Sequence, residues 1–421
     1  MNGDAERLRS WELDNGMVVV SESMPWVESI GVSLVVPAGC VYDPADRLGL
    51  ANFTCEMAER GAGERDSRDF LEAFEMLGVD WSSSVSLAHT AVGGAMLADR
   101  FEPALELFAD LLRRPRLPVD QLEDARQSCL RELHALEDDL AQRVMAELRR
   151  RFYPAPWGRL TEGTEASLEA VSIDDVRQFH EACYRAGGSI ISVAGKIDFD
   201  GMVPVVENLF GDWDRGTAPQ LSTAPAPHGY HHIPHDSAQT HIAIACDSVP
   251  YRDPDYYQSR GAIGVLSDGM SSRLFTEVRE KRGLVYSVSA SCYSLKDRGA
   301  VFCYAGTTPD RAQETLDVVL AELVRLNEGV QQNELDRLKA RIKSGLIMQQ
   351  ESSAARSRQL ASSWYYLDRL RSIDEISRFI DELSCDSIND YLNRHPLGDF
   401  TIVTLGPEPL EVPRDLSTAS T

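Results

Sequence analysis

The sequence predicts an α+β fold of two homologous domains, each a mostly antiparallel sheet with helices packed on one face. Two observations lead to this class. Stretches in which apolar and polar residues alternate are grouped along the chain, and long stretches with helical periodicity follow them as a group. The same order of elements then occurs a second time, so the chain is interpreted as a duplication.

Four segments of the first half recur in the second half at nearly one distance, with offsets of 210, 211, 212 and 211 residues. Each match is weak by itself, but the agreement between the four offsets is strong evidence for an internal repeat. The pairs are YDP at 42–44 with YRDP at 251–254, ADRFEPALELFADLL from 98 with PDRAQETLDVVLAEL from 309, SIDDVRQF from 172 with SCDSINDY from 384, and ISVAGKID from 191 with IVTLGPEP from 402.

In the first half, alternation predicts strands in GMVVVSES from 16, in SIGVSLVVPAG from 29 and in VDWSSSVSLAHTAVGGAML from 79. A helix is expected at 49–60, between the second and third of these stretches. Long amphipathic helices follow at 102–114 and 119–151, and a helix and a last strand close the half.

In the second half, strands are expected in THIAIACDSV from 240, LVYSVSASCY from 284 and AVFCYAGTT from 300. A helical region is expected at 257–282, because two serines precede its last part and Gly283 follows it as a helix stop. Long helices are expected at 310–327 and 331–366.

The length of the chain and one polar stretch define the expected domains. A chain of 421 residues is too long for one ordinary core. The segment GDWDRGTAPQLSTAPAPHGY has the Pro, Gly, Ser and Thr content of a linker. We therefore expect an N-terminal domain at 1–212, a linker at 213–235 and a C-terminal domain at 236–421.

The composition excludes several classes of partner and compartment. The formal charge of −24 disfavours nucleic acid, whose phosphates it would repel, and leaves basic peptides open. The chain has no run of about 18 apolar residues, so no membrane span is expected. The N-terminal stretch is polar and acidic, unlike a signal or transit peptide, and the eight cysteines are scattered without a CxxC pair. These features predict a protein of the reducing cytoplasm.

Five phrases of the sequence resemble the pitrilysin-type (M16) peptidases, also called the insulinase family. They are LDNGMVVV, VPAGCVYDP, GLANFTCEM, FYPAPWGRLTEGTEASLEAVSIDDVRQFHEACY and SSRLFTEVREKRGLVYSVSA, and the resemblance runs from roughly residue 12 to 408. It implies the short bacterial M16B branch, in which a chain of two domains forms half of a clamshell and a second chain closes it. The subunits of the mitochondrial processing peptidase are similar.

The zinc motif of that family is absent from this chain. The family motif is H-x-x-E-H, in which two histidines four residues apart bind Zn²⁺ and the glutamate between them activates water. The resemblance aligns the first histidine of the motif with Asn52, the catalytic glutamate with Cys55 and the second histidine with Glu56. The third family ligand, a glutamate from a later helix, matches Glu132 in CLREL.

Two interpretations of these positions remain open. Asn52, Glu56 and Glu132 offer oxygen ligands that suit a hard cation such as Mg²⁺ or Ca²⁺. The alternative is a helix packed against a helix, with Glu132 retained by descent. In neither case is there a general base, because Cys55 does not easily replace a carboxylate. No metal or other cofactor is therefore expected in this chain, and zinc is expected in a partner subunit.

Arg279 and Tyr286, in FTEVREKRGLVY, resemble the Arg/Tyr pair of the family. Arg279 is expected on the last turns of a helix and Tyr286 near the start of the next strand, so a short reversal can bring them to one surface. The resemblance implies that they hold peptide over the zinc of the opposite half. An arginine fork binds a peptide carbonyl, and a tyrosine hydroxyl stabilises a developing oxyanion.

Three other features are interpreted as structural. Pro234 and the strand that follows it argue against a metal site among the five histidines of HGYHHIPHDSAQTH. The arginines at 149–151 fit a solvated helix end, and Ser271 with Ser272 fits a helix cap.

The resulting hypothesis is a non-catalytic subunit of a heterodimeric M16B zinc metallopeptidase. The partner would be a catalytic M16B chain with H-x-x-E-H, and the substrate an unfolded peptide. The alternatives are an inert scaffold derived from a peptidase and a peptide-binding homodimer without catalysis. An adjacent gene that encodes H-x-x-E-H would favour the first hypothesis.

Overall fold

The computed structural model describes residues 7–349 and 351–413. The chain forms two compact units, each built from segments that are not contiguous in the sequence. Unit 1 comprises Met1–Ala135, Arg159–Thr223 and Ile347–Ser372, and unit 2 comprises Leu136–Gly158, Ala224–Leu346 and Ile373–Thr421.

Unit 1 contains a six-stranded sheet in the order β1-β2-β8-β3-β7-β6. Only β2 and β8 run parallel, and the other neighbours are antiparallel. The strands are β1 (Leu8–Glu12), β2 (Val18–Ser23), β3 (Ser29–Val36), β6 (Asp80–Val85), β7 (Thr90–Leu97) and β8 (Ile190–Gly195).

Unit 2 repeats this topology. Its five-stranded sheet has the order β9-β13-β10-β12-β11, which corresponds strand by strand to β2-β8-β3-β7-β6. The one parallel pair, β9 with β13, corresponds to β2 with β8. The strands are β9 (Tyr230–Pro234), β10 (Thr240–Ser248), β11 (Val285–Ser294), β12 (Gly299–Thr307) and β13 (Thr401–Gly406).

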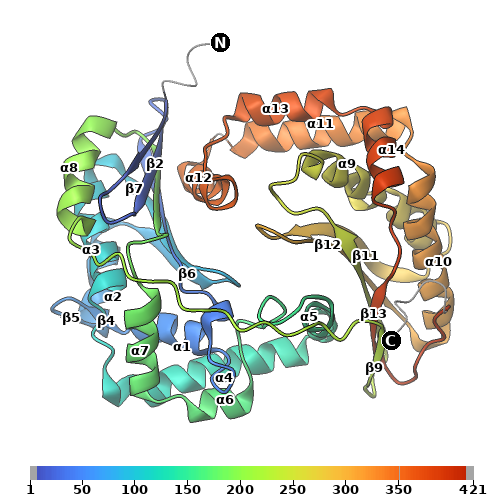
Figure 1. Cartoon of the computed structure of the whole chain (residues 1–421), viewed down its shortest axis with the longest axis horizontal. Helices are drawn as coiled ribbons and strands as arrows, with labels where there is room; N and C mark the ends of the chain where they lie inside the picture. The colour runs from blue at the N-terminus through green and yellow to red at the C-terminus, as the bar shows by residue number, and fades with distance from the viewer. Residues whose placement is uncertain (1–6, 350, 414–421) are drawn as a thin grey trace. The chain divides into compact units, whose positions relative to one another are not determined.

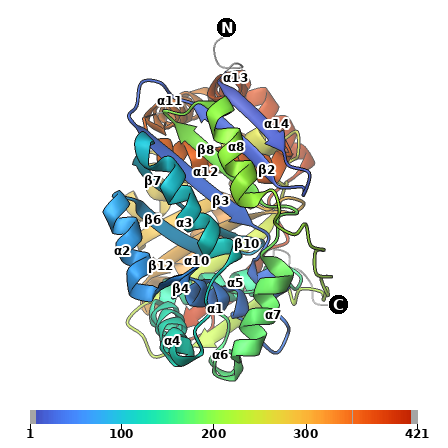
Figure 2. The same ribbon diagram turned by 90° about the vertical axis from the view of Figure 1, so that its left-hand side faces the viewer.

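Most helices of each unit cover one face of its sheet, as the sequence predicts. Figure 2 shows α2, α3 and α8 lying across the strands of unit 1. The unit 1 helices are α1 (Leu50–Ala58), α2 (Ser67–Leu77), α3 (Phe101–Arg113), α4 (Leu122–Asp138), α6 (Glu165–Ala170), α7 (Ile173–Cys183) and α8 (Phe199–Phe210), with a short β4–β5 hairpin (Gly61–Ala62, Arg65–Asp66). The unit 2 helices are α9 (Tyr256–Ser267), α10 (Ala312–Arg325), α11 (Gln332–Gln349), α13 (Ile373–Glu382) and α14 (Cys385–Arg394).

One further helix covers the opposite face of each sheet. In unit 1 this is α12 (Ser353–Leu367), whose Leu360 and Ala361 pack on Val35 and Ile190 (Figure 1). Gly31 permits the close approach, because a Cβ there would meet the backbone of the first turn of α12. In unit 2, α5 (Leu140–Phe152) packs through an apolar face on the alanines of β10 and on β13.

Three long helical predictions are corrected by the structure, because each region forms two helices. The predicted helix 119–151 breaks at Asp139, whose carboxylate accepts from the first amides of α5. The predicted helix 331–366 forms α11 and α12, and the Ser352 hydroxyl caps the second of these. The region 257–282 forms α9 and a π-helix at Phe275–Glu280, separated at Gly269, which has a φ of 98°.

The helix α5 follows α4 of unit 1 along the chain but belongs to unit 2. Likewise, α12 follows α11 of unit 2 but belongs to unit 1. The domain limits at 212 and 236 remain a prediction, since a repeat and a compact unit divide the chain by different criteria. The eight cysteines are free thiols, and six of them are buried. No helix among the described residues combines the length and apolar character that a membrane span needs.

Candidate functional site

The helix α1, which carries the altered motif positions, is fixed at its N-terminus by Asp43. The two carboxylate oxygens of Asp43 accept from the amides of Gly49 and Ala51, each at 2.8 Å. Phe53 and Met57 on α1 are buried in the main core of unit 1. This packing turns Asn52 and Glu56 toward α4.

Two polar contacts join these positions to their surroundings. The Asn52 side-chain amide donates to Glu132 Oε2 of α4 at 2.8 Å, so the structure brings the first and last motif positions together. Glu56 forms an ion pair of 2.6 Å with Arg60, one turn later on the same segment. Arg60 also donates to the Ser128 hydroxyl of α4 at 3.4 Å.

Cys55, which the resemblance aligns with the family's catalytic glutamate, is buried as an unreactive thiol. Its side chain is only 6% exposed, and it lies 3.4 Å from the Ser83 hydroxyl. Burial first, and then the nearby Glu59 carboxylate, raise the pKa of the Cys55 thiol to about 12. Because the thiolate is the nucleophile and the metal ligand, this cysteine stays an inert thiol at neutral pH.

The second candidate site lies at the π-helix Phe275–Glu280. The Lys281 amide donates to the Thr276 carbonyl five residues earlier at 2.9 Å, which gives this segment its wider turn. Gly283 then ends the helix with a φ of 59° and leads into β11. The π-helix therefore sets the direction in which Arg279 leaves the backbone.

Tyr286 is the extra residue of a β-bulge at the start of β11. The residue before it pairs with Thr307 and the residue after it pairs with Gly306, so Tyr286 has no partner in the ladder. Its side chain is 83% exposed. The guanidinium carbon of Arg279 lies 5.4 Å from the Tyr286 ring centroid and 4.9 Å from that of Phe275. The structure thus brings Arg279 and Tyr286 together on one surface.

Comparisons with known proteins cover the whole of this architecture. The model of the insulinase peptidase family M16 matches residues 18–165, and that of the peptidase M16 inactive domain matches residues 170–342. The chain belongs to the M16 peptidase family.

Relatives match over nearly their full length. An uncharacterized zinc protease of Rickettsia felis is 25% identical over 401 residues, which are 95% of this chain and 97% of that protein. One of Mycobacterium tuberculosis is 29% identical over 417 residues, 95% of this chain and 93% of that protein. A crystal structure described as a peptidase M16 inactive domain from Pseudomonas fluorescens superposes with a TM-score of 0.88 at 24% identity, covering 96% and 99% of the two chains. The α+β fold class predicted from the sequence is therefore confirmed.

Zinc, which the M16 family implies, does not fit the residues of α1. Position 52 offers an amide that already donates to Glu132, position 55 a protonated thiol, and Glu56 is paired with Arg60. Positions 52 and 55 therefore offer neither an imidazole nor a thiolate, and the one ionised group, the Glu56 carboxylate, is neutralised by Arg60. Within the described ranges, no group of three or more His, Cys, Asp or Glu side chains is placed to hold a metal ion.

The other features singled out in the sequence have separate partners. His232 and His241 bind the hydroxyls of Thr404 and Tyr304, at 3.0 and 2.8 Å, and do not converge. Lys281 and Arg282 both pair with Glu277, at 2.6 and 3.2 Å, as expected for basic residues at a helix end. The role of Phe275 was not predicted from the sequence, although a spacing of four residues from Arg279 on a helix indicates such a contact.

Proposed function

We propose that this chain is the zinc-less subunit of a two-chain M16 peptidase and supplies Arg279 and Tyr286 to a peptide bound by both chains. One observation carries the proposal. The Arg279 guanidinium lies against the Tyr286 ring, and no hydrogen bond or ion pair within the described residues engages the guanidinium or the Tyr286 hydroxyl. The side chains at the altered zinc positions are, by contrast, engaged with each other and with Arg60.

Each group of the pair has a distinct role in this proposal. The Arg279 guanidinium binds a backbone carbonyl of the peptide, and stacking on Phe275 limits its orientations before the peptide arrives. The Tyr286 hydroxyl donates to the oxygen of the scissile carbonyl as negative charge develops there. The partner chain supplies zinc, held by its H-x-x-E-H helix, as the Lewis acid of the reaction.

We also propose the class of ligand and the compartment, from the charge and the cysteines of the chain. The formal charge of −24 argues against nucleic acid as a ligand and is compatible with peptides, above all basic ones. Eight free thiols support a reducing compartment, which we propose to be the cytoplasm.

The test is a pair reconstituted from this chain and a catalytic M16 chain that carries H-x-x-E-H. Tyr286→Phe keeps the ring and removes one donor to the oxyanion, so kcat should fall by about 10²–10³ while assembly is unchanged. Lys281→Ala, two residues from Arg279 and paired with Glu277, is the matched control and should change turnover little.

Two results would replace this proposal by one of its alternatives. If Tyr286→Phe and Lys281→Ala give the same turnover in an active pair, the Arg/Tyr assignment is wrong and a scaffold role explains the chain better. If the chain forms only homodimers and does not bind the catalytic M16 chain, the assignment as a heterodimer subunit is wrong.

A further inference from the structure

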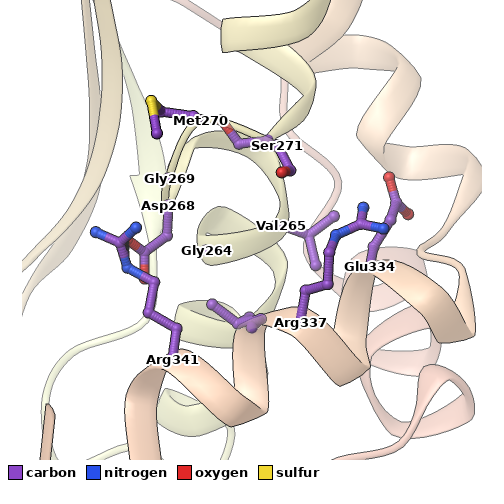
Figure 3. A pocket seen from close by; sticks show the side chains of 11 residues that line it. Gly264, Val265, Asp268, Gly269, Met270, Ser271, Glu334, Arg337 and Arg341 are labelled. Atoms are coloured by element: carbon purple, nitrogen blue, oxygen red, sulfur yellow. Dashed lines mark ion pairs between the residues drawn. The ribbon is translucent and has the colours of Figure 1, made fainter. Parts of the chain in front are cut away.

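The π-helix Phe275–Glu280 is anchored on its N-terminal side by ion pairs to α11. The loop before it lines a small pocket against this helix, where the Asp268 carboxylate pairs with Arg341 Nε at 2.9 Å (Figure 3). Arg273, which follows the loop, donates to the Glu334 carboxylate of α11 through two bonds of 2.8 Å. The start of the π-helix is therefore fixed to the rest of unit 2.

On its C-terminal side the π-helix ends in a reversal of the chain, and three successive carbonyl groups of this reversal accept hydrogen bonds from side chains. Arg311 Nη2 donates to the carbonyl of Arg282 at 2.9 Å, and Arg311 Nη1 donates to that of Gly283 at 2.7 Å. The Thr307 hydroxyl donates to the carbonyl of Leu284, also at 2.7 Å. Since the last carbonyls of a helix have no partner within it, these donors fix the course of the chain beyond the helix.

Arg311 reaches the reversal from an element that packs on the π-helix. It ends the 3₁₀ turn Pro309–Arg311 at the start of α10, where its amide donates to the carbonyl of Thr308 at 3.1 Å. Leu316 of α10 and Val278 of the π-helix are buried in the same core of unit 2. The guanidinium is therefore held at a constant place relative to the π-helix.

The carbonyls that Arg311 binds lie between Arg279 and Tyr286 along the chain. The Arg279 guanidinium carbon is 5.4 Å from the Tyr286 ring centroid. An exposed contact of this kind is weak by itself, so the backbone between the two residues must set their distance. An arginine that binds two successive carbonyls with its planar fork restrains that backbone more than a single donor does.

We propose that Arg311 is a positioning residue for the Arg279/Tyr286 pair. By binding the two carbonyls of the reversal, it keeps the Arg279 guanidinium and the Tyr286 hydroxyl at the spacing that one bound peptide requires. Arg311 acts through these two residues and does not touch the peptide. That the spacing serves a peptide rests on the proposed function, whereas the bonds of Arg311 to the reversal do not depend on it.

The first measurement is hydrogen exchange in the isolated full chain, which needs neither a partner nor catalysis. Arg311→Gln should raise the exchange rate of the segment 282–287 by about tenfold or more, because a segment whose carbonyls lose their donors opens locally more often. The control is Lys339→Gln, which also removes a cation that donates to a backbone carbonyl, that of Asp381 at 2.9 Å. The control should leave exchange in 282–287 unchanged, and unfolding curves establish that each variant folds.

The second measurement is peptide turnover by the reconstituted pair. Arg311→Gln should lower kcat by about 10–100-fold, since a displacement of about 1 Å near reacting groups has an effect of this size. In a chain that also carries Tyr286→Phe, the same substitution should lower kcat by less than about threefold, because the hydroxyl that it positions is already absent. Arg311→Lys keeps the charge but does not bind both carbonyls as a fork, so it should recover only part of the loss.

Three outcomes would overturn the proposal: unchanged exchange in the Arg311→Gln chain, equal losses of kcat with and without the Tyr286 hydroxyl, or full recovery by Arg311→Lys. Equal losses would leave Arg311 a purely structural role and would not affect the proposed function. If Tyr286→Phe alone has no effect, the proposed function fails and the positioning role fails with it, while hydrogen exchange still decides whether Arg311 holds the reversal.

Discussion

Two substitutions should return a zinc site to this chain without returning catalysis. Asn52→His and Glu56→His together place two imidazoles four residues apart on α1. The Asn52 side chain already reaches Glu132 Oε2 at 2.8 Å, so an imidazole at this position would lie beside the third ligand. Since α1 and α4 keep this spacing, we expect the double variant to bind one zinc ion per chain, whereas the unaltered chain binds none tightly.

The expected effect on stability follows from the contacts that are lost. Metal-free protein loses the Asn52–Glu132 hydrogen bond and the Glu56–Arg60 ion pair, each worth about 1 kcal/mol at such partly exposed sites. The free energy of unfolding should therefore fall by about 2 kcal/mol in chelator. At a zinc concentration about 100 times the dissociation constant, binding restores about 2.7 kcal/mol. Urea unfolding with and without zinc, together with calorimetry, measures both numbers.

Two controls make the test specific. Glu72→His with Met76→His, made together with Asp69→Asn to remove the nearby carboxylate, places an equal pair of imidazoles on exposed positions of α2. The double variant of α1 should bind zinc at least tenfold more tightly than this pair, and adding Glu132→Gln should abolish the difference. Zinc affinity equal to that of the α2 pair would refute the inference that α1 and α4 retain the geometry of a metal site. Peptide hydrolysis by the double variant would refute the assignment of Cys55 as an inert thiol.

Gly31→Ala should lower the free energy of unfolding in urea by about 1–3 kcal/mol, because the new Cβ would meet the backbone of Ser353. Gly345→Ala should instead raise this free energy by about 1 kcal/mol, because a Cβ there meets nothing within 4 Å. Burial lowers the pKa of His180 to about 4 from an ordinary value of 6.5, so the unfolded chain takes up the proton first as the pH falls. The folded state should consequently lose about 1–2 kcal/mol of stability between pH 7 and pH 5, and unfolding curves of His180→Gln should lack this part of the loss. Phe275→Leu removes the ring under Arg279, and in the reconstituted pair it should raise KM by about 2–5-fold with kcat nearly unchanged, since a solvent-exposed cation–π contact is worth about 0.5–1 kcal/mol; a change confined to kcat would contradict a positioning role.

The order of the elements could be predicted from the sequence because alternation and helical periodicity are local signals. The four repeat offsets predicted two similar domains, and the strands of the two sheets do correspond in order, apart from the additional strand β1. The sheet on which α5 or α12 packs could not be predicted in this way. An apolar stripe shows that a helix is buried, but it does not show which sheet covers it. Asp139 and Ser352 did carry the relevant local signal, since each caps a new helix within a periodic stretch.

The candidate site could likewise be predicted only in part from the sequence. The resemblance placed Asn52 and Glu132 at positions that the structure brings into contact. The conformation around Arg279 and Tyr286 was beyond sequence reasoning, because a π-helix and a β-bulge both insert one residue into a regular pattern. Strict alternation along β11 would place Tyr286 and Ser287 on opposite faces, yet both side chains are exposed.

The polar contacts around α1 balance a group of neighbouring carboxylates. Burial raises the pKa of the Glu59 carboxyl, and the nearby Glu56 and Glu132 carboxylates raise it further. Without a cation, three such carboxylates would repel one another and push α1 away from α4. The Arg60 guanidinium neutralises Glu56 and also reaches Ser128 of α4, while the Asn52 amide donates to Glu132. Nitrogen donors from the chain itself thus join the two helices at the positions that the resemblance aligns with the zinc motif. Because each donor satisfies a different carboxylate, a single histidine at position 52 or 56 would remove one of these contacts without supplying the pair of imidazoles that a zinc site needs.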